Sequence, residues 1–238
     1  MPGEDLGPEA LEVTRTLAKE ALRLTRHLGR STVQVGMLYP PDADYTYDPM
    51  SQAYLELGFQ CKHAEHQMYV DISPAPPVLG AQVWADYDIP EEMLDDVLRL
   101  LTLASTDAIF GDLSMEPIVW TRQRLSEAHA RLRSRGAHTL LVGIIDNGRV
   151  VALTELSRHG DADPEVCEWT LTVTDREHRR QGLATKAKQH AQYAVAEHWP
   201  TVRRAYCSVA DADPAMNALY ARLGAHAISA SSAYELTL

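Results

Sequence analysis

Several features of membrane and secreted proteins are missing from this sequence. No apolar run reaches the roughly 18 residues that a membrane-spanning helix needs, so no membrane anchor is expected. The first residues, MPGEDLGPEALEV, lack the basic start and apolar stretch of a signal peptide. The cysteines are few and widely spaced (Cys61, Cys167 and Cys207), which favours reduced thiols over a disulfide framework. Together these absences predict a cytoplasmic protein.

Basic residues are also in short supply. The 238 residues include 22 Lys and Arg against 33 Asp and Glu, a formal net charge of −11. A surface of this sign repels nucleic acids and attracts cations, amines above all, although many proteins are acidic for solubility alone. With 45% hydrophobic and 23% charged residues, the composition is that of a soluble globular chain, long enough for one large domain or two small ones.

The apolar pattern predicts helices and strands in both halves of the chain. The first helix, 8–28, is expected to place Leu11, Leu17, Ala21, Leu24 and Leu28 roughly on one face. The proline-rich stretch SPAPPVLG is read as a linker between two domains. The other predicted elements are strands at 31–38, 66–72, 165–173, 203–209 and the C-terminal tail, helices at 50–59, 89–105, 121–136 and 213–224, and a hairpin at 138–156 that turns at Asp-Asn-Gly.

Two short segments of the chain resemble each other. AYLELGF (53–59) matches LYARLGA (219–225), so that Tyr54 falls on Tyr220 and Gly58 on Gly224. DPMSQAY resembles DPAMNALY with one residue of slippage, and a long helix and a strand precede each segment in the same order. We therefore expect a partial copy of one structural unit followed by a full copy.

The turn RRQGLA, residues 179–184, stands where a strand gives way to a helix. A helix that starts near Gly182 leaves its first amides unpaired and its positive dipole end open to an anion. Glycine allows close approach, and the two arginines add charge-assisted donors suited to phosphate. The alternative is an arginine-rich turn with a glycine for geometry. The helix itself is expected to pack through Ala184, Ala187, Ala191, Ala194 and Val195, with Lys186, Lys188 and Gln192 outward.

A strand, then Arg-x-x-Gly-x-Ala opening a helix, then a strand and a short helix ending LYARLG resembles the GCN5-related N-acetyltransferase (GNAT) superfamily. The resemblance covers residues 81–238. It implies an α/β (α+β) fold with a mixed central sheet flanked by helices. Residues 81–238 would form the complete acetyltransferase domain, and residues 1–75 a partial, degenerate lobe without a coenzyme site. Tandem members such as the mycothiol synthase-like enzymes have a comparable architecture.

The resemblance implies acetyl-coenzyme A as co-substrate, with its pyrophosphate on the loop and its pantetheine arm on the backbone of the preceding strand. There are departures: Arg180 is atypical, Gly224-Ala225 replaces the usual Gly-Phe, and Asp213 stands where the family often has asparagine. The expected coenzyme-binding residues are Leu171, Thr172, Val173, Arg179, Arg180, Gln181, Gly182, Leu183, Ala184 and Asp213.

The resemblance also implies that Tyr220 gives a proton to the leaving thiolate, the alternative being a tyrosine that only packs. Glu168, or Glu155 on the preceding strand, could act as the base or bind the substrate ammonium; surface solvation is the alternative for both. Strand alternation is expected to put Glu168, Thr170 and Thr172 on one face, opposite Trp169, Leu171 and Val173. The group Cys61, His63 and His66 lacks the spacing and the fourth ligand of a metal site, so none is expected.

These inferences predict an acetyl-coenzyme A-dependent N-acetyltransferase that moves an acetyl group directly to a primary amine of a small molecule. The acidic balance favours an amino-sugar, a polyamine, an antibiotic amine or an amino acid derivative; a homodimer is left open. Two alternatives remain: a catalytically silent binding or scaffolding protein of the same fold, and another acyl-coenzyme A reaction, such as decarboxylation or transfer of a longer acyl group.

Overall fold

The computed structural model describes residues 8–44, 46 and 48–238; the MPGEDLG start of the chain lies outside this part. Within it, no helix is long and apolar enough to cross a bilayer.

The predicted helices and strands are present, strand β3 was not anticipated, and β2 is longer than expected. The elements are α1 (Pro8–His27), β1 (Thr32–Tyr39), α2 (Pro49–Glu56), β2 (Gln60–Asp71), β3 (Ala81–Ala85), α3 (Glu91–Asp107), α4 (Arg122–Ser134), β4 (His138–Asp146), β5 (Arg149–Arg158), β6 (Val166–Thr174), the 3-10 turn η2 (Arg176–His178), α5 (Leu183–His198), β7 (Arg204–Ala210), α6 (Pro214–Arg222) and β8 (His226–Thr237).

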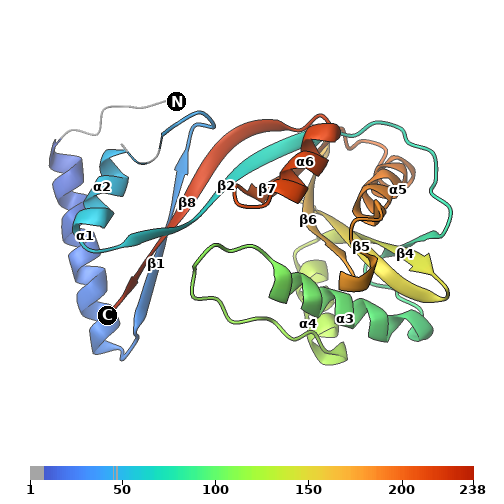
Figure 1. Cartoon of the computed structure of the whole chain (residues 1–238), viewed down its shortest axis with the longest axis horizontal. Helices are drawn as coiled ribbons and strands as arrows, with labels where there is room; N and C mark the ends of the chain where they lie inside the picture. Colours follow the sequence, from blue (N-terminus) through green and yellow to red (C-terminus); the bar gives the residue numbers. More distant parts are fainter. Residues whose placement is uncertain (1–7, 45, 47) are drawn as a thin grey trace.

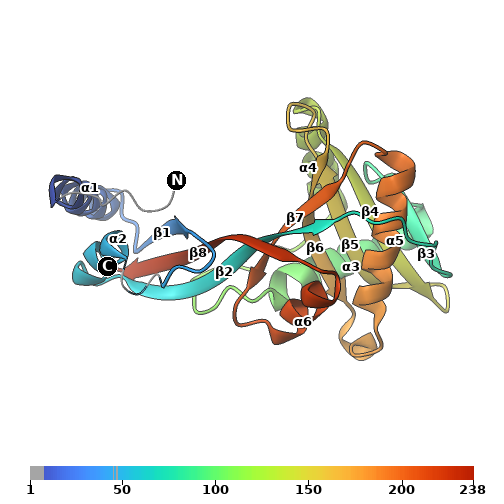
Figure 2. The ribbon, with the colours of Figure 1, turned by 90° about the horizontal axis from the view of Figure 1, so that it is seen from above.

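The described strands form one mixed sheet in the order β1-β8-β2-β7-β6-β5-β4-β3. Only β6 and β7 run parallel; the other neighbours are antiparallel. Figure 1 shows two lobes joined by the long strands β2 and β8, and Figure 2 shows these two strands twisting from one lobe into the other. The sheet is therefore continuous through both lobes, in agreement with the expected mixed sheet flanked by helices.

The two lobes exchange strands. Strand β2, from the first part of the chain, pairs with β7 of the second lobe, whereas β8, the last strand, pairs with β1 of the first lobe. The core of the first lobe accordingly combines Leu22 and Phe59 with Tyr234 from β8. The long loop between α3 and α4 also contacts β2, because the amide of Asp112 donates to the carbonyl of Lys62 (2.9 Å). The first lobe is thus completed by the C-terminal end of the chain.

The second lobe has three layers. Leu140 and Val142 of β4 pack in the cluster that contains residues of α5 and α6, whereas Leu141 packs in the cluster that contains residues of α3 and α4. This alternation places helices on both faces of the sheet (Figure 1). The Asp-Asn-Gly turn between β4 and β5 closes the predicted hairpin. These layers hold β6 and the start of α5, where the expected coenzyme site lies.

The predicted apolar face of α1 is wrong. Ala18 and Leu22 are buried, whereas Leu17, Leu24 and Leu28 are 65%, 49% and 62% exposed. The reason is the small size of the first lobe, in which α1 packs mainly on α2 and β1 through a narrow stripe. A leucine pattern thus predicted the helix but not which side of it is covered.

Candidate active site

Strands β6 and β7 diverge along their length. They pair only from Val166 to Glu168 on β6 and from Arg204 to Tyr206 on β7. Beyond Glu168, β6 continues to Thr174 without pairing to β7, so its backbone on that side is open. The segment Leu171–Val173, expected to hold the pantetheine arm, lies on this open edge.

A bulge interrupts β6 at Thr170. In the ladder with β5, Leu156 faces Trp169 but Glu155 faces Leu171, which leaves Thr170 as an extra residue. The predicted simple alternation is therefore wrong. Trp169 packs with the core beneath α5 and α6, whereas Leu171 and Val173 pack on the opposite face against α3. The extra residue reverses which side chains of β6 face each side of the sheet, just after the last residue that pairs with β7.

The loop after β6 ends at Gly182, the N-cap of α5. Gly182 has φ +75°, no side chain caps this helix, and a Cβ at this position would meet nothing within 4 Å. The first amides of α5 therefore face open space, as an anion-binding helix start requires. Of the flanking positions, Gln181 is exposed, and Leu183 packs on a small cluster that includes Ala187.

Asp107, the last residue of α3, holds two arginines of the loop. Arg176 Nε lies 3.0 Å from a carboxylate oxygen of Asp107, and Arg179 forms an ion pair with the same carboxylate. The hydrogen bonds from Arg176, and then those from Arg179, lower the pKa of Asp107 to about 2. Arg180 has φ +62° and is exposed, and it makes no hydrogen bond or ion pair with the described residues. Of the two arginines predicted to bind the coenzyme, Arg180 is therefore the one whose side chain is available to a ligand. The role of Asp107 was not indicated by any sequence pattern.

Asp213 serves as the N-cap of α6. Its side chain accepts a hydrogen bond from the amide of Met216 (2.9 Å). The carboxylate, predicted as a neighbour of the coenzyme, therefore has a structural partner already. Its charge sits near the positive end of the α6 dipole, which is the favourable end for an acid.

Tyr220 is a buried residue, with 4% of its surface exposed. Its ring stands edge-on to Trp169 of β6, with the centroids 6.2 Å apart. Burial raises its pKa well above the ordinary value, and the nearby thiol of Cys207 on β7 raises it further. The predicted acid thus lies beside the point where β6 and β7 separate.

The expectation that Lys188 and Gln192 point outward is wrong. Lys188 is 0% and Gln192 is 8% exposed. Lys188 Nζ lies 2.7 Å from the Tyr220 hydroxyl and 3.8 Å from the centroid of the Trp169 ring. Burial lowers the pKa of Lys188 well below its ordinary value. More of the surface of α5 is buried than its alanines indicated. The side that carries Lys188 contacts Tyr220 of α6 and is therefore not exposed to solvent.

The two candidate glutamates differ sharply in environment. The Glu168 side chain is 60% exposed, with an oxygen 3.8 Å from the His159 ring. Glu155 is 7% exposed and accepts hydrogen bonds from Tyr87 (2.7 Å) and Thr170 (2.6 Å). Burial raises the pKa of Glu155. Tyr87 has φ +57°, a costly conformation for a tyrosine, and it directs its hydroxyl to this carboxyl group.

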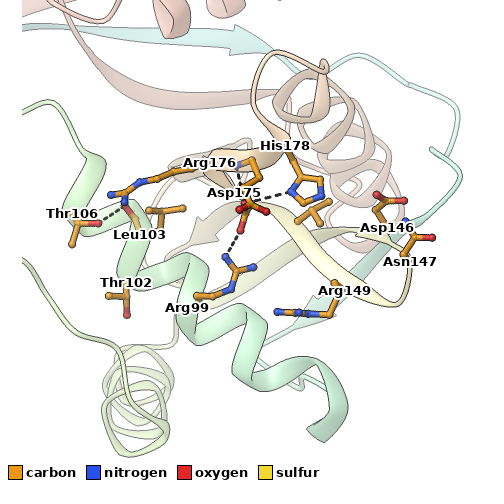
Figure 3. Close-up of a pocket in the computed structure, with 12 residues that line it drawn as sticks. Arg99, Thr102, Leu103, Thr106, Asp146, Asn147, Arg149, Asp175, Arg176 and His178 are labelled. Atoms are coloured by element: carbon orange, nitrogen blue, oxygen red, sulfur yellow. Dashed lines mark hydrogen bonds and ion pairs between the residues drawn. The ribbon is translucent and has the colours of Figure 1, made fainter.

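An open cavity of about 730 Å³ lies between α3, the β4–β5 turn and the start of the loop (Figure 3). Asp175 stands at its centre, joined to Arg99 by an ion pair and to His178 at 3.4 Å. Neither Gly182 nor Tyr220 lines it, so the cavity borders the first half of the loop and not the helix start at Gly182. The lining residues are Arg99, Thr102, Leu103, Thr106, Asp146, Asn147, Arg149, Val151, Asp175, Arg176, Glu177 and His178.

Both histidines of the Cys61, His63 and His66 group contact other residues of the chain. His66 contacts Asp211 at 2.6 Å and the carbonyl of Pro41 at 3.2 Å, and His63 lies 3.5 Å from Glu65. In the part of the chain that the structure describes, no group of three or more His, Cys, Asp or Glu residues could hold a metal ion.

The fold, the diverging strands and the glycine at the helix start define an acetyltransferase scaffold. A family model, the Acetyltransferase (GNAT) family, matches residues 106–225, half of the chain. The protein belongs to the GNAT family. No curated protein matches it at a significant level.

Solved structures resemble the whole chain. One is a tandem GNAT protein from the clavulanic acid biosynthesis pathway, with a TM-score of 0.70 and 22% identity over 94% of this chain and 69% of that one. Another is a GCN5-related N-acetyltransferase from Sphaerobacter thermophilus, with a TM-score of 0.65 and 16% identity over 98% of this chain and 70% of that one. At these identities the likeness establishes the fold, which includes both lobes.

Proposed function

We propose that this protein is an acetyl-coenzyme A-dependent N-acetyltransferase that transfers the acetyl group directly to a primary amine of a small molecule. The observation that carries the proposal is the open edge of β6 leading straight to the uncapped helix start at Gly182. An unpaired strand edge can bind an extended, amide-containing arm, and a free helix N-terminus can bind a pyrophosphate. Coenzyme A contains both groups in that order.

In this proposal the pantetheine arm runs along Leu171–Val173 and the pyrophosphate sits on the amides of 179–184. Gly182 leaves room for the phosphate oxygens, and Arg180 supplies a free guanidinium. Arg179 would contribute through its backbone while its side chain stays with Asp107. Asp213 would stand near the coenzyme only as the cap of α6.

The chemistry requires a neutral amine that attacks the thioester carbonyl. A C–N bond forms, the C–S bond breaks, and the sulfur leaves as a thiolate that needs a proton. We assign this proton to the Tyr220 hydroxyl, which lies beside the diverging strands. The acceptor nitrogen loses one proton in forming the amide, and this proton replaces the one that Tyr220 gave to the thiolate.

Two carboxyl groups are candidates for the base. Glu168 is accessible to a substrate and stands where β6 and β7 separate. Glu155 is buried next to the Thr170 bulge on the α3 side of the sheet, where an amine could reach it only by displacing Tyr87. We assign the role to Glu168, acting directly or through water, with Glu155 as the alternative.

The acceptor is proposed to be a cationic small molecule, such as an amino-sugar, a polyamine, an antibiotic amine or an amino acid derivative, because the net charge of −11 favours amines. Residues 1–75 are proposed to be a partial GNAT-like copy that does not bind the coenzyme. The first lobe would support the second through the exchanged strands β2 and β8.

A coenzyme-binding protein without turnover is the second candidate. It is favoured by Tyr220 itself, whose hydroxyl already accepts a hydrogen bond from Lys188 (2.7 Å). The test is thiol release from acetyl-coenzyme A across a panel of amines, with mass spectrometry to identify an acetylated product. Amine-dependent thiol release is expected. Coenzyme binding by calorimetry without thiol release for any amine would favour the second candidate.

A further inference from the structure

Lys188 is the most unusual ionisable residue in the second lobe. It comes from the first turns of α5, it is 0% exposed, and its Nζ contacts residues from two other elements. Tyr220 of α6 lies at 2.7 Å, and the rings of Trp169 and Tyr220 lie below Nζ at 3.8 and 4.2 Å from their centroids. Cys207 of β7 is close enough to interact with Lys188 electrostatically.

No carboxylate among the described residues pairs with Lys188. The titratable groups that face Nζ are Tyr220 and Cys207, both of which are neutral near pH 7 because burial raises the pKa of each. Burial without a charged partner lowers the pKa of Lys188 and so favours its amine form. A neutral amine still has two N–H donors and one lone pair.

We propose that Lys188 is a positioning residue for Tyr220, donating an N–H to the phenol oxygen at 2.7 Å and so directing the phenol proton toward the leaving sulfur. The inference rests on the proposed acetyltransfer. The N–H occupies a lone pair of the phenol oxygen, so the O–H bond points away from Lys188 and is available to the thiolate of a bound coenzyme.

The step balances without a further reactant. The O–H bond of Tyr220 breaks, an S–H bond forms on the thiolate, and negative charge moves to the phenol oxygen. The N–H of Lys188 stabilises this phenolate, since hydrogen bonds to charged oxygens are the stronger kind. The proton that the acceptor nitrogen releases then restores the phenol.

The test is Lys188→Met, which removes the donor and keeps an unbranched side chain of similar length. We expect kcat to fall on the order of tenfold, as for a lost hydrogen bond to a developing charge, with the KM for acetyl-coenzyme A within about twofold. The matched control is Lys186→Met, on the same helix but exposed, which should leave kcat unchanged.

A double-mutant cycle separates positioning from packing. In a Tyr220→Phe background the added Lys188→Met change should alter kcat by less than about twofold, because there is no phenol left to orient. An undiminished kcat in the single variant, or an equal loss in both backgrounds, would overturn the inference.

A readout without turnover keeps this inference distinct from the proposed function. Absence of amine-dependent thiol release in the parent protein would overturn the proposed function. The ¹³Cζ resonance of Tyr220 then still reports on the contact: it should shift in Lys188→Met and stay in place in Lys186→Met. An unmoved resonance in Lys188→Met would show that Lys188 does not act on the phenol.

Discussion

The carbonyl oxygens of Tyr54 and Tyr220 accept matching pairs of hydrogen bonds at the ends of two short helices. Each receives the amide three residues later and the amide five residues later, and each helix has an aspartate N-cap followed by proline. The surroundings of the two rings differ: Tyr54 is half-buried against Phe59, whereas Tyr220 is buried against Trp169. The paired amides are those of Leu57 (3.1 Å) and Phe59 (3.1 Å), and of Leu223 (3.0 Å) and Ala225 (3.0 Å).

Replacing Tyr220 by phenylalanine tests the proposed acid. The ring remains, so packing against Trp169 and the affinity for the coenzyme should hardly change. Loss of a general acid typically costs on the order of 100- to 10,000-fold in rate, and we expect this loss in kcat with KM nearly constant. Steady-state kinetics and calorimetry measure the two effects separately.

Tyr54→Phe is the control at the matching position. It makes the same chemical change in a lobe where no coenzyme is expected, so its kcat should equal that of the parent. A Tyr220→Phe variant that turns over within about threefold of the parent would mean that Tyr220 only packs and that water or another group supplies the proton.

The coenzyme loop can be tested at Gly182. Glutamate there would strain the backbone, since φ is +75°, and would set a carboxylate against the pyrophosphate. We expect calorimetry to find one acetyl-coenzyme A site per chain in the parent and none in Gly182→Glu.

Gly29 offers a matched control for this strain. It has φ +64°, and a Cβ there would also meet nothing within 4 Å, but it follows α1 in the first lobe. Gly29→Glu should lose stability and still bind the coenzyme. Two sites per chain, or unweakened binding by Gly182→Glu, would refute the placement at 179–184.

Lys188 also predicts how stability varies with pH. Its pKa is lowered by folding, so below the ordinary pKa the unfolded chain binds a proton that the native lysine does not. The loss of folding stability caused by burying Lys188 is therefore largest at low pH, and it diminishes as the pH rises toward the ordinary pKa of lysine. Where only the unfolded state is protonated, the slope is about 1.4 kcal/mol per pH unit.

Lys188→Met should remove this penalty. Urea unfolding should find the variant more stable than the parent, with an advantage that shrinks between about pH 7 and pH 10. Lys186→Met, at an exposed position, should show no such trend. A constant difference across this pH range would mean that Lys188 is charged in the folded protein.

Local patterns in the sequence predicted much of the fold. The Asp-Asn-Gly turn indicated the β4–β5 hairpin, and the acidic start of α3 indicated that helix. The RRQGLA stretch predicted a helix start near Gly182, and α5 starts at Leu183. Each of these signals depends on residues that are close in the chain.

The features that were missed depend on contacts between distant segments. Lys188 is covered by Tyr220 of α6, 32 residues later, and the ion pair of Arg179 with Asp107 joins residues 72 apart. The exchange of β2 and β8 likewise leaves no local pattern, because a strand has the same alternation whichever neighbour it pairs with. The bulge at Thr170 shifts that alternation by one residue without a glycine to indicate it.

The base can be identified by comparing two glutamate variants. If Glu168 takes the proton of the acceptor amine, Glu168→Gln should lower kcat on the order of 100-fold near pH 7. The loss should diminish at higher pH, where solvent deprotonates the amine. Glu155→Gln should keep most of its activity. The reverse order of the two losses would assign the role to Glu155.

Glu155 makes a final prediction about stability. Because burial raises its pKa, the folded protein favours the protonated carboxyl, while the unfolded chain ionises above the ordinary pKa of about 4.5. The parent therefore loses stability from this residue as the pH rises through that value toward the folded pKa. Glutamine cannot ionise, so Glu155→Gln should be relatively more stable at pH 8 than at pH 4, by up to about 1.4 kcal/mol per pH unit within that window. Glu168→Gln, at an exposed position, should follow the parent at both pH values. Equal shifts for the two variants in denaturant titrations would mean that Glu155 is ionised in the fold, with Tyr87 and Thr170 as donors to a carboxylate.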